Sequence, residues 1–167
     1  DGTVIPVEDR TIKPITYHLN VMFPKDLHDI TQLIAEDWNE AFKDTVEALG
    51  VDVDSDTKVF QIVENSCNID AVNAFAKEHD LEDKLTEAGL SAVAYGNLEK
   101  VCAVLEFHTK DTDHVFTWEQ LGDLRYSFLN WTTKAELSSP LGYGPSAADP
   151  LTGEIISANA NVYGTIV

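Results

Sequence analysis

Positive charge is scarce in this chain. Its 167 residues include 11 basic residues against 29 acidic ones, which gives a formal net charge of −18. A charge of this sign and size opposes binding to nucleic acid or to an anionic membrane surface, so neither partner is expected. Ordinary solubility, a saline habitat and bound cations such as Ca²⁺ are three alternative uses of so many carboxylates.

Long apolar runs and internal repeats are also lacking. No run reaches the ~18 residues that a bilayer-spanning helix needs, so no membrane span is expected. The chain starts at Asp1 without a methionine or a signal-like segment, which is typical of a processed or excised piece. The hydrophobic content of 44% is enough for a sizeable core, and we expect a single domain over residues 1–167, with 1–11 as an extended lead-in.

Cysteine is limited to Cys67 and Cys102. Their spacing matches no metal-binding or redox motif. In an oxidising compartment the two residues can form one disulfide, and otherwise they are two buried thiols.

The first half of the chain carries clear periodic patterns. Apolar and polar residues alternate in ITYHLNV at 15–21, which predicts a strand. The stretch 25–49 predicts a long helix that ends at Gly50, with an apolar stripe expected to pack on a sheet. The stripe consists of Leu27, Ile30, Ile34, Trp38, Ala41, Phe42, Val46 and Leu49.

Further along the chain, a β-rich run at 58–63 predicts a second strand, and 68–88 predicts helical structure capped by Asn68. KVCAVLEFHT, at 100–109, is continuous in β-formers and predicts a central strand. A turn at Gly122 and Asp123 precedes another predicted strand near 126–131. This order favours an α/β (α+β) sandwich, in which two or three helices pack on a twisted mixed sheet of about five strands.

The last predicted strand, at 155–162, follows a loop dense in glycine and proline at 142–154. Its polar residues alternate with apolar ones, so we expect a half-buried strand at or near a sheet edge. Such an edge offers backbone groups to an extended peptide, and the alternative is that the strand is simply paired inside a sheet. Within the loop, we expect the Asp149 carboxylate to accept backbone N–H bonds across its turn.

Three groups of residues are candidate cation ligands. The alternating Asp52, Asp54 and Asp56 resemble half of a calcium loop, but Thr57 and Val63 stand where an EF-hand needs glycine and glutamate. Asp149 and Glu154 are weak calcium candidates in the glycine-rich loop. The third group, which also fits an exposed acidic loop, is His108, Asp111, Asp113 and His114.

Several motifs resemble those of bacterial secreted metzincin-type zinc metallopeptidases. DLRYSFLNW at 123–131 and GPSAADPLTGEII at 144–156 look like the segment that precedes the zinc helix in that group. ITYHLNVMFPKDLHDITQLIAEDWNEAF at 15–42 looks like its opening strand and first helix. The resemblance covers both ends of the chain and leaves about 50–118 unsupported. It implies a twisted sheet with helices whose edge strand pairs with the substrate backbone.

The zinc helix H-E-x-x-H is absent from this chain, whose five histidines include no pair at i, i+4. The resemblance therefore implies a substrate-aligning N-terminal part that is inert alone, with zinc held by a C-terminal half of the same protein. It also implies a secreted, cell-surface or periplasmic location. Substrate contacts are expected along Ile156, Ser157, Ala158 and Asn159. The alternatives are a non-enzymatic extracellular interaction or surface-assembly module and a calcium-stabilised structural module.

Overall fold

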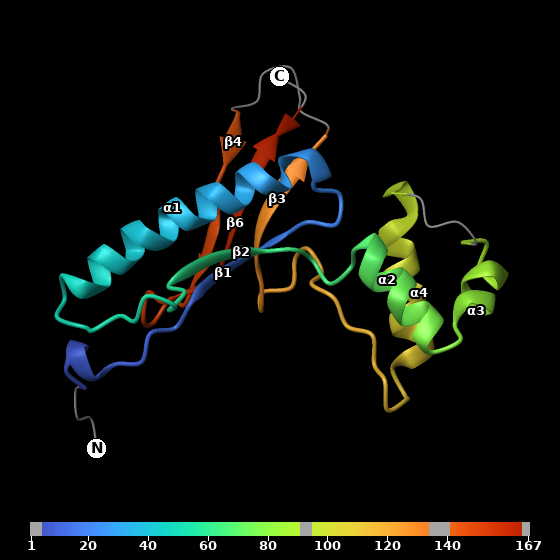
Figure 1. Ribbon diagram of the computed structural model, residues 1–167, viewed down its shortest axis with the longest axis horizontal. Helices are drawn as coiled ribbons and strands as arrows, with labels where there is room; N and C mark the ends of the chain where they lie inside the picture. The colour runs from blue at the N-terminus through green and yellow to red at the C-terminus, as the bar shows by residue number, and fades with distance from the viewer. Residues whose placement is uncertain (1–4, 91–94, 134–140, 165–167) are drawn as a thin grey trace. The chain divides into compact units, whose positions relative to one another are not determined.

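A computed structural model describes residues 5–90, 95–133 and 141–164. Its six strands form a mixed sheet in the order β2-β1-β3-β6-β4, and β5 also pairs with β6 (Figure 1). β3 runs parallel to β6, whereas β4 and β5 run antiparallel to it. The strands are β1 (Ile15–Leu19), β2 (Phe60–Val63), β3 (Ser127–Thr132), β4 (Gly142–Tyr143), β5 (Ser146–Ala148) and β6 (Ile155–Tyr163).

Several helices accompany this mixed sheet, so the mixed α/β architecture expected from the sequence is confirmed. The α-helices are α1 (His28–Glu47), α2 (Ile69–Glu78), α3 (Glu82–Glu87) and α4 (Leu98–Thr109). Short 3₁₀ turns are η1 (Val7–Asp9), η2 (Lys25–Leu27) and η3 (Tyr95–Asn97). No helix among the described residues is long and apolar enough to cross a membrane.

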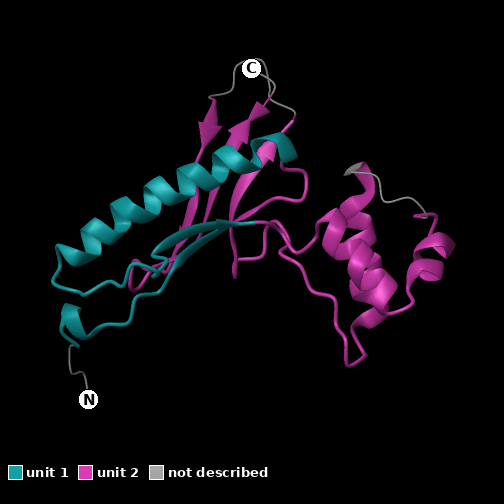
Figure 2. Ribbon diagram, viewed as in Figure 1, with its two compact units in different colours: residues 1–17, 24–63 teal, residues 18–23, 64–167 magenta. Residues whose placement is uncertain are grey.

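The chain divides into two compact units, shown in Figure 2. Unit 1 comprises residues 1–17 and 24–63, and unit 2 comprises 18–23 and 64–167, so β1 contributes to both. In unit 1, α1 packs on β2, and the ring of Phe42 stacks on that of Phe60 with centroids 5.6 Å apart.

The expected helix near 25–49 is present, but its expected buried face is wrong. The buried residues of α1 are Thr31, Ala35, Asn39 and Lys43, a row at four-residue spacing. The predicted apolar stripe is largely exposed instead, and Trp38 retains 54% of its accessible surface. The reason is that α1 meets backbone groups of β2 and of the preceding loop, which require polar partners.

The core of unit 2 is built by its helices. Its buried members are Val21, Cys67, Val72, Ala76, Leu85, Leu90, Leu98, Val101, Cys102, Leu105 and Phe116. A disulfide joins Cys67 to Cys102 within this core, with the Cα atoms 5.9 Å apart. α2 begins as predicted, since the Asn68 side chain accepts the Ala71 N–H at 2.9 Å.

The prediction of a central strand at 100–109 is wrong, because this segment forms α4. Its buried residues are Leu98, Val101, Cys102, Leu105 and Thr109, which recur at three and four residues and so lie on one helical face. An unbroken apolar run has no clear period, and so it fits a buried strand and a buried helix equally well.

Candidate functional site: the β4–β5 margin

β6 was expected at or near the sheet edge, and it lies one strand inside it. Residues 128–132 of β3 pair with 159–163 of β6 on one side. β4 and β5 pair with β6 on the other side. The prediction that 155–162 offers an open row of backbone groups is therefore wrong, because neighbouring strands already occupy most of these groups.

The four residues expected to contact substrate differ in exposure. Ile156 is 53% exposed, whereas Ser157 is only 6% exposed. The backbone N–H of Ala158 donates to Ser127 Oγ at 3.0 Å, and that of Asn159 donates to Pro145 O at 2.9 Å. Ala158 and Asn159 thus use these amide hydrogens within unit 2.

The margin of unit 2 is formed instead by β4 and β5, which we call the β4–β5 margin (residues 142–148). Each of the two strands pairs only with β6 among the described parts of the chain. Tyr143 is 62% exposed, and Gly142, Gly144, Ser146 and Ala148 are also exposed. The margin is therefore exposed at these five positions, whereas Pro145 and Ala147 are half-buried.

The backbone groups of this margin alternate between β6 and solvent. Pro145 O accepts from Asn159, and Ala147 is paired with Ser157, so Pro145 and Ala147 direct backbone groups toward β6. Because successive residues of a strand point their N–H and C=O groups to opposite sides, Ser146 directs its groups outward. The register shifts between Ala147 and Ala148, but the Asp149 N–H again bonds Glu154 O, so Ala148 also directs its groups outward. These outward groups are what an added strand would pair with.

Close backbone approach and an asparagine ladder hold β4 against β6. A Cβ on Gly142 would lie 2.9 Å from Asn161 O, so only glycine fits there without a shift of the backbone. Asn130 Nδ2 donates to Asn161 Oδ1 at 2.9 Å, and Asn161 Nδ2 donates to Tyr143 O at 3.0 Å. The asparagine side chains thus tie β3, β6 and β4 together.

The turn that joins β5 to β6 is fixed by Asp149, as the sequence predicted. Its Oδ1 accepts the N–H groups of Leu151 at 2.7 Å and of Thr152 at 3.4 Å. The Asp149 N–H donates to Glu154 O at 2.8 Å, and Gly153 adopts a φ of +73° that favours glycine. The Asp149 carboxylate is thus engaged by its own turn.

The other end of the strand order looks different. β2 lies beside α1, and Asn39 Oδ1 accepts the N–H groups of Val59 at 2.8 Å and of Phe60 at 3.1 Å. Gln32 Nε2 donates to Ile62 O at 3.1 Å. Side chains of α1 thus take up backbone groups along the margin of β2.

No metal site joins the candidate ligands. The described residues contain no group of three or more His, Cys, Asp or Glu side chains able to hold a metal ion. His114 stacks on His79, with ring centroids 4.7 Å apart, and His108 lies edge-on to Phe107. His108, Asp111, Asp113 and His114, for which an exposed acidic loop was the other interpretation, therefore do not form such a group, and neither do Asp149 with Glu154 or the aspartates at 52–56.

His18 lies in β1 beside the Glu119 carboxylate. Burial lowers the pKa of its imidazole, and the nearby Glu119 carboxylate, whose Oε1 lies 3.9 Å from Nδ1, opposes that shift. Glu119 itself accepts hydrogen bonds from the Ser66 N–H and hydroxyl. In a catalytic triad the histidine stands between the nucleophile and the carboxylate. Here the Ser66 hydroxyl bonds the Glu119 carboxylate directly, so these described residues are not arranged as a triad.

Sequence reasoning missed Ser146 and Ala148 as site residues. GYGPSAA reads as a loop, because its glycines and proline hide two strands of only two and three residues. The signal that could have indicated a short paired strand is the run of small residues in PSAA, close in sequence to a long alternating strand.

Comparison of the chain with protein-family models, with curated proteins and with solved structures finds no match.

Proposed function

We propose that the chain is the N-terminal, substrate-aligning part of a secreted zinc metallopeptidase. In this proposal the β4–β5 margin receives an extended peptide by strand addition. The observation that carries the proposal is the exposure of 142–148 together with the outward backbone groups of Ser146 and Ala148.

The sequence motifs support the same segment. GPSAADPLTGEII at 144–156, which resembles the peptidase group, covers β5, the Asp149 turn and the start of β6. The proposal therefore assigns substrate alignment to β4 and β5, in place of the β6 residues expected from the sequence. Ile156 remains a candidate for contact with a substrate side chain, since it is exposed on the adjacent strand.

The described residues do not fit a zinc site, because they offer no group of three ligands. The proposal therefore assigns the zinc ligands to a C-terminal half of the same protein, and no step of hydrolysis is derived from this chain. The Cys67–Cys102 disulfide supports a secreted, cell-surface or periplasmic location, because such bonds persist in oxidising compartments.

A non-enzymatic extracellular interaction or surface-assembly module is the second candidate. It is favoured by the same margin, because strand addition requires no metal. A calcium-stabilised module has less support, since the Asp149 carboxylate is already satisfied by backbone N–H groups.

The first experiment separates the two candidates. The gene is sequenced beyond the codon for Val167, and the complete product is assayed against unfolded casein with and without a zinc chelator. A downstream H-E-x-x-H and chelator-sensitive cleavage are expected. A complete product without that motif and without cleavage contradicts the peptidase and leaves the module.

The second experiment tests the margin itself. Ser146→Pro removes one outward N–H group but no bond to β6. In the complete enzyme we expect KM to rise about tenfold with little change in kcat, because the lost hydrogen bond serves binding. Lys84→Ala, on the exposed surface of α3, is the control and should leave both constants unchanged. An unchanged KM in Ser146→Pro contradicts strand addition at this position.

A further inference from the structure

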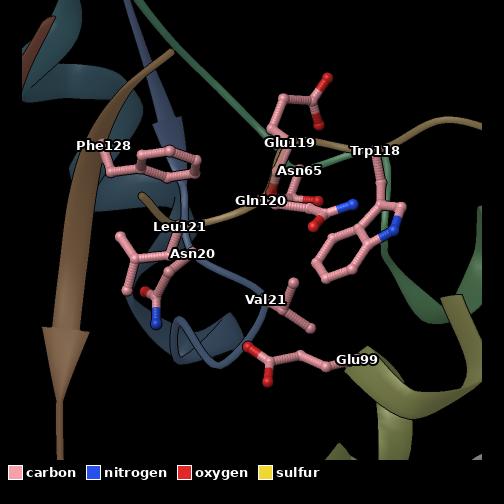
Figure 3. A pocket seen from close by; sticks show the side chains of 9 residues that line it. All are labelled: Asn20, Val21, Asn65, Glu99, Trp118, Glu119, Gln120, Leu121 and Phe128. Atoms are coloured by element: carbon pink, nitrogen blue, oxygen red, sulfur yellow. The ribbon is translucent and has the colours of Figure 1, made fainter. Parts of the chain in front are cut away.

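Unit 2 contains a pocket that is separate from the β4–β5 margin. Its volume is about 280 Å³, near the lower end of ligand-binding cavities. Nine side chains line it, and Figure 3 shows them: Asn20, Val21, Asn65, Glu99, Trp118, Glu119, Gln120, Leu121 and Phe128.

Three of the lining residues are buried. Phe128 is 1% exposed, Asn65 2% and Val21 7%. Asn65 Oδ1 accepts the Cys67 N–H at 2.8 Å, and its Nδ2 donates to Glu119 O at 2.8 Å. The pocket thus has a preformed wall fastened to the disulfide-bonded core.

Most polar groups of the lining are engaged within the protein. The Asn20 side chain donates to Trp131 O and accepts the Trp131 N–H. Trp118 Nε1 and Gln120 Nε2 both donate to Glu106 Oε2, at 3.1 and 2.9 Å. The Glu119 carboxylate is held by Ser66 and points away from the other labelled side chains (Figure 3). These groups shape the pocket and leave little hydrogen-bonding capacity for a ligand.

The side-chain polar atoms of the pocket that remain without a partner are hydrogen-bond acceptors. Glu99, in the first turn of α4, extends toward Val21 at the pocket (Figure 3), and its carboxylate has no partner among the described residues. The amide oxygen of Gln120 likewise has no partner there, because only Nε2 of that side chain is bonded. Around these acceptors stand the indole of Trp118 and the apolar Val21, Leu121 and Phe128.

We propose that this pocket binds a cation carried on an aliphatic stem, such as the ammonium group of a lysine side chain or of a free alkylamine. The ammonium would pair with the exposed Glu99 carboxylate, and the stem would lie on Val21 and Leu121. The Trp118 ring adds a face that attracts cations. The net charge of −18 draws such ligands toward the protein.

The probe is n-butylammonium, titrated into the ¹⁵N-labelled chain and followed by amide chemical shifts, with n-butanol as the uncharged comparison. Saturable shifts at residues 20–21, 99 and 118–121 are expected for the amine only, with a dissociation constant in the millimolar range. Raising the salt to 1 M should weaken binding, because the pair is screened. Equal binding of n-butanol, or no saturable shift with the amine, overturns the proposal.

Two variants with a matched control locate the site. Glu99→Gln should weaken amine binding about fivefold, the scale of a partly exposed ion pair. Leu121→Ala should weaken it about threefold, because the 56% exposed Leu121 supports only the stem. Glu82→Gln removes an exposed first-turn glutamate from α3, outside the pocket, and should change nothing. Equal loss in Glu99→Gln and Glu82→Gln would show that general charge attraction, and not the pocket, holds the amine.

The source of the cation is decided by a further comparison. Nα-acetyl-lysine amide represents a lysine side chain within a peptide, and cadaverine represents a free amine. Tighter binding of the acetylated lysine assigns the pocket to a peptide, and tighter binding of cadaverine assigns it to a small amine. Binding of neither overturns the proposal.

Discussion

The strands at the two ends of the strand order differ in how their backbone groups are covered. β2 in unit 1 has its backbone groups taken up by Asn39 and Gln32 of α1. The β4–β5 margin in unit 2 has no such cover among the described residues. An exposed strand edge is an aggregation hazard that proteins usually blunt. At the margin of β2, backbone groups are covered by the buried Asn39 and the exposed Gln32. One covered margin and one open margin are what we expect if the open margin has a partner.

The largest loss of stability should come from removing the side chain that bonds the backbone at the start of β2. Asn39 is 3% exposed and satisfies the N–H groups of Val59 and Phe60. Asn39→Ala leaves both donors without a partner, so we expect a loss of roughly 2 to 4 kcal/mol in the free energy of unfolding. Urea melts give the free energy, and hydrogen exchange at Val59 and Phe60 should accelerate in parallel.

Asn39→Asp is the matched control, because it keeps a side-chain acceptor in place. It should cost clearly less than Asn39→Ala. Equal losses in the two variants would mean that packing of the asparagine, and not sealing of the strand, accounts for its burial.

The second effect concerns the aromatic contact between α1 and β2. Phe42 is half-buried and stacks on Phe60, whereas Trp38 is 54% exposed, with its ring centroid 6.4 Å from that of Phe60. We expect Phe42→Ala to cost roughly 2 kcal/mol and Trp38→Ala roughly 1 kcal/mol, both less than a fully buried aromatic residue. Thermal unfolding of both variants checks the order, and a larger loss for Trp38→Ala would contradict the exposed position of Trp38.

This reversal of the α1 face shows where sequence patterns stop. Apolar spacing predicted the helix and its length, because periodicity and the stop at Gly50 are local properties. It could not predict that Asn39 and Lys43 face inward, because their partners, Val59, Phe60 and Ser55 O, are distant in sequence. The face that α1 buries is therefore set by hydrogen bonds to backbone groups and not by the burial of its apolar side chains.

In unit 2, too, local sequence patterns predicted some elements and not others. β3 and the Asn68 cap of α2 were predictable from local alternation and capping chemistry. α4 was not predictable, because its apolar residues form an unbroken run without a clear helical period. β4 and β5 were not, because two- and three-residue strands exist only through their pairing with β6. The open margin is therefore a tertiary feature that the sequence alone does not reveal.

A third, smaller effect tests what holds the open margin in place. Asp149→Ala removes the acceptor for the Leu151 and Thr152 N–H groups in the turn between β5 and β6. We expect a loss of about 1 kcal/mol and faster exchange over 149–154, with no change at β2. Asp149→Asn keeps an acceptor and should restore most of the protection. Unchanged exchange in Asp149→Ala would show that the turn is held by Gly153 and the backbone alone.

The smallest effect gives the sharpest test of the contrast between the margins. Ser146 directs its N–H group outward from β5, so Ser146→Pro should cost less than about 0.5 kcal/mol in the isolated chain. Ala147→Pro, one residue along, removes an N–H group that faces β6 and should cost about 3 kcal/mol. Urea melts of the two proline variants measure this difference directly. If Ser146→Pro is as costly as Ala147→Pro, the Ser146 N–H is already bonded within the protein, the β4–β5 margin is sealed like that of β2, and an added peptide strand has nothing to pair with.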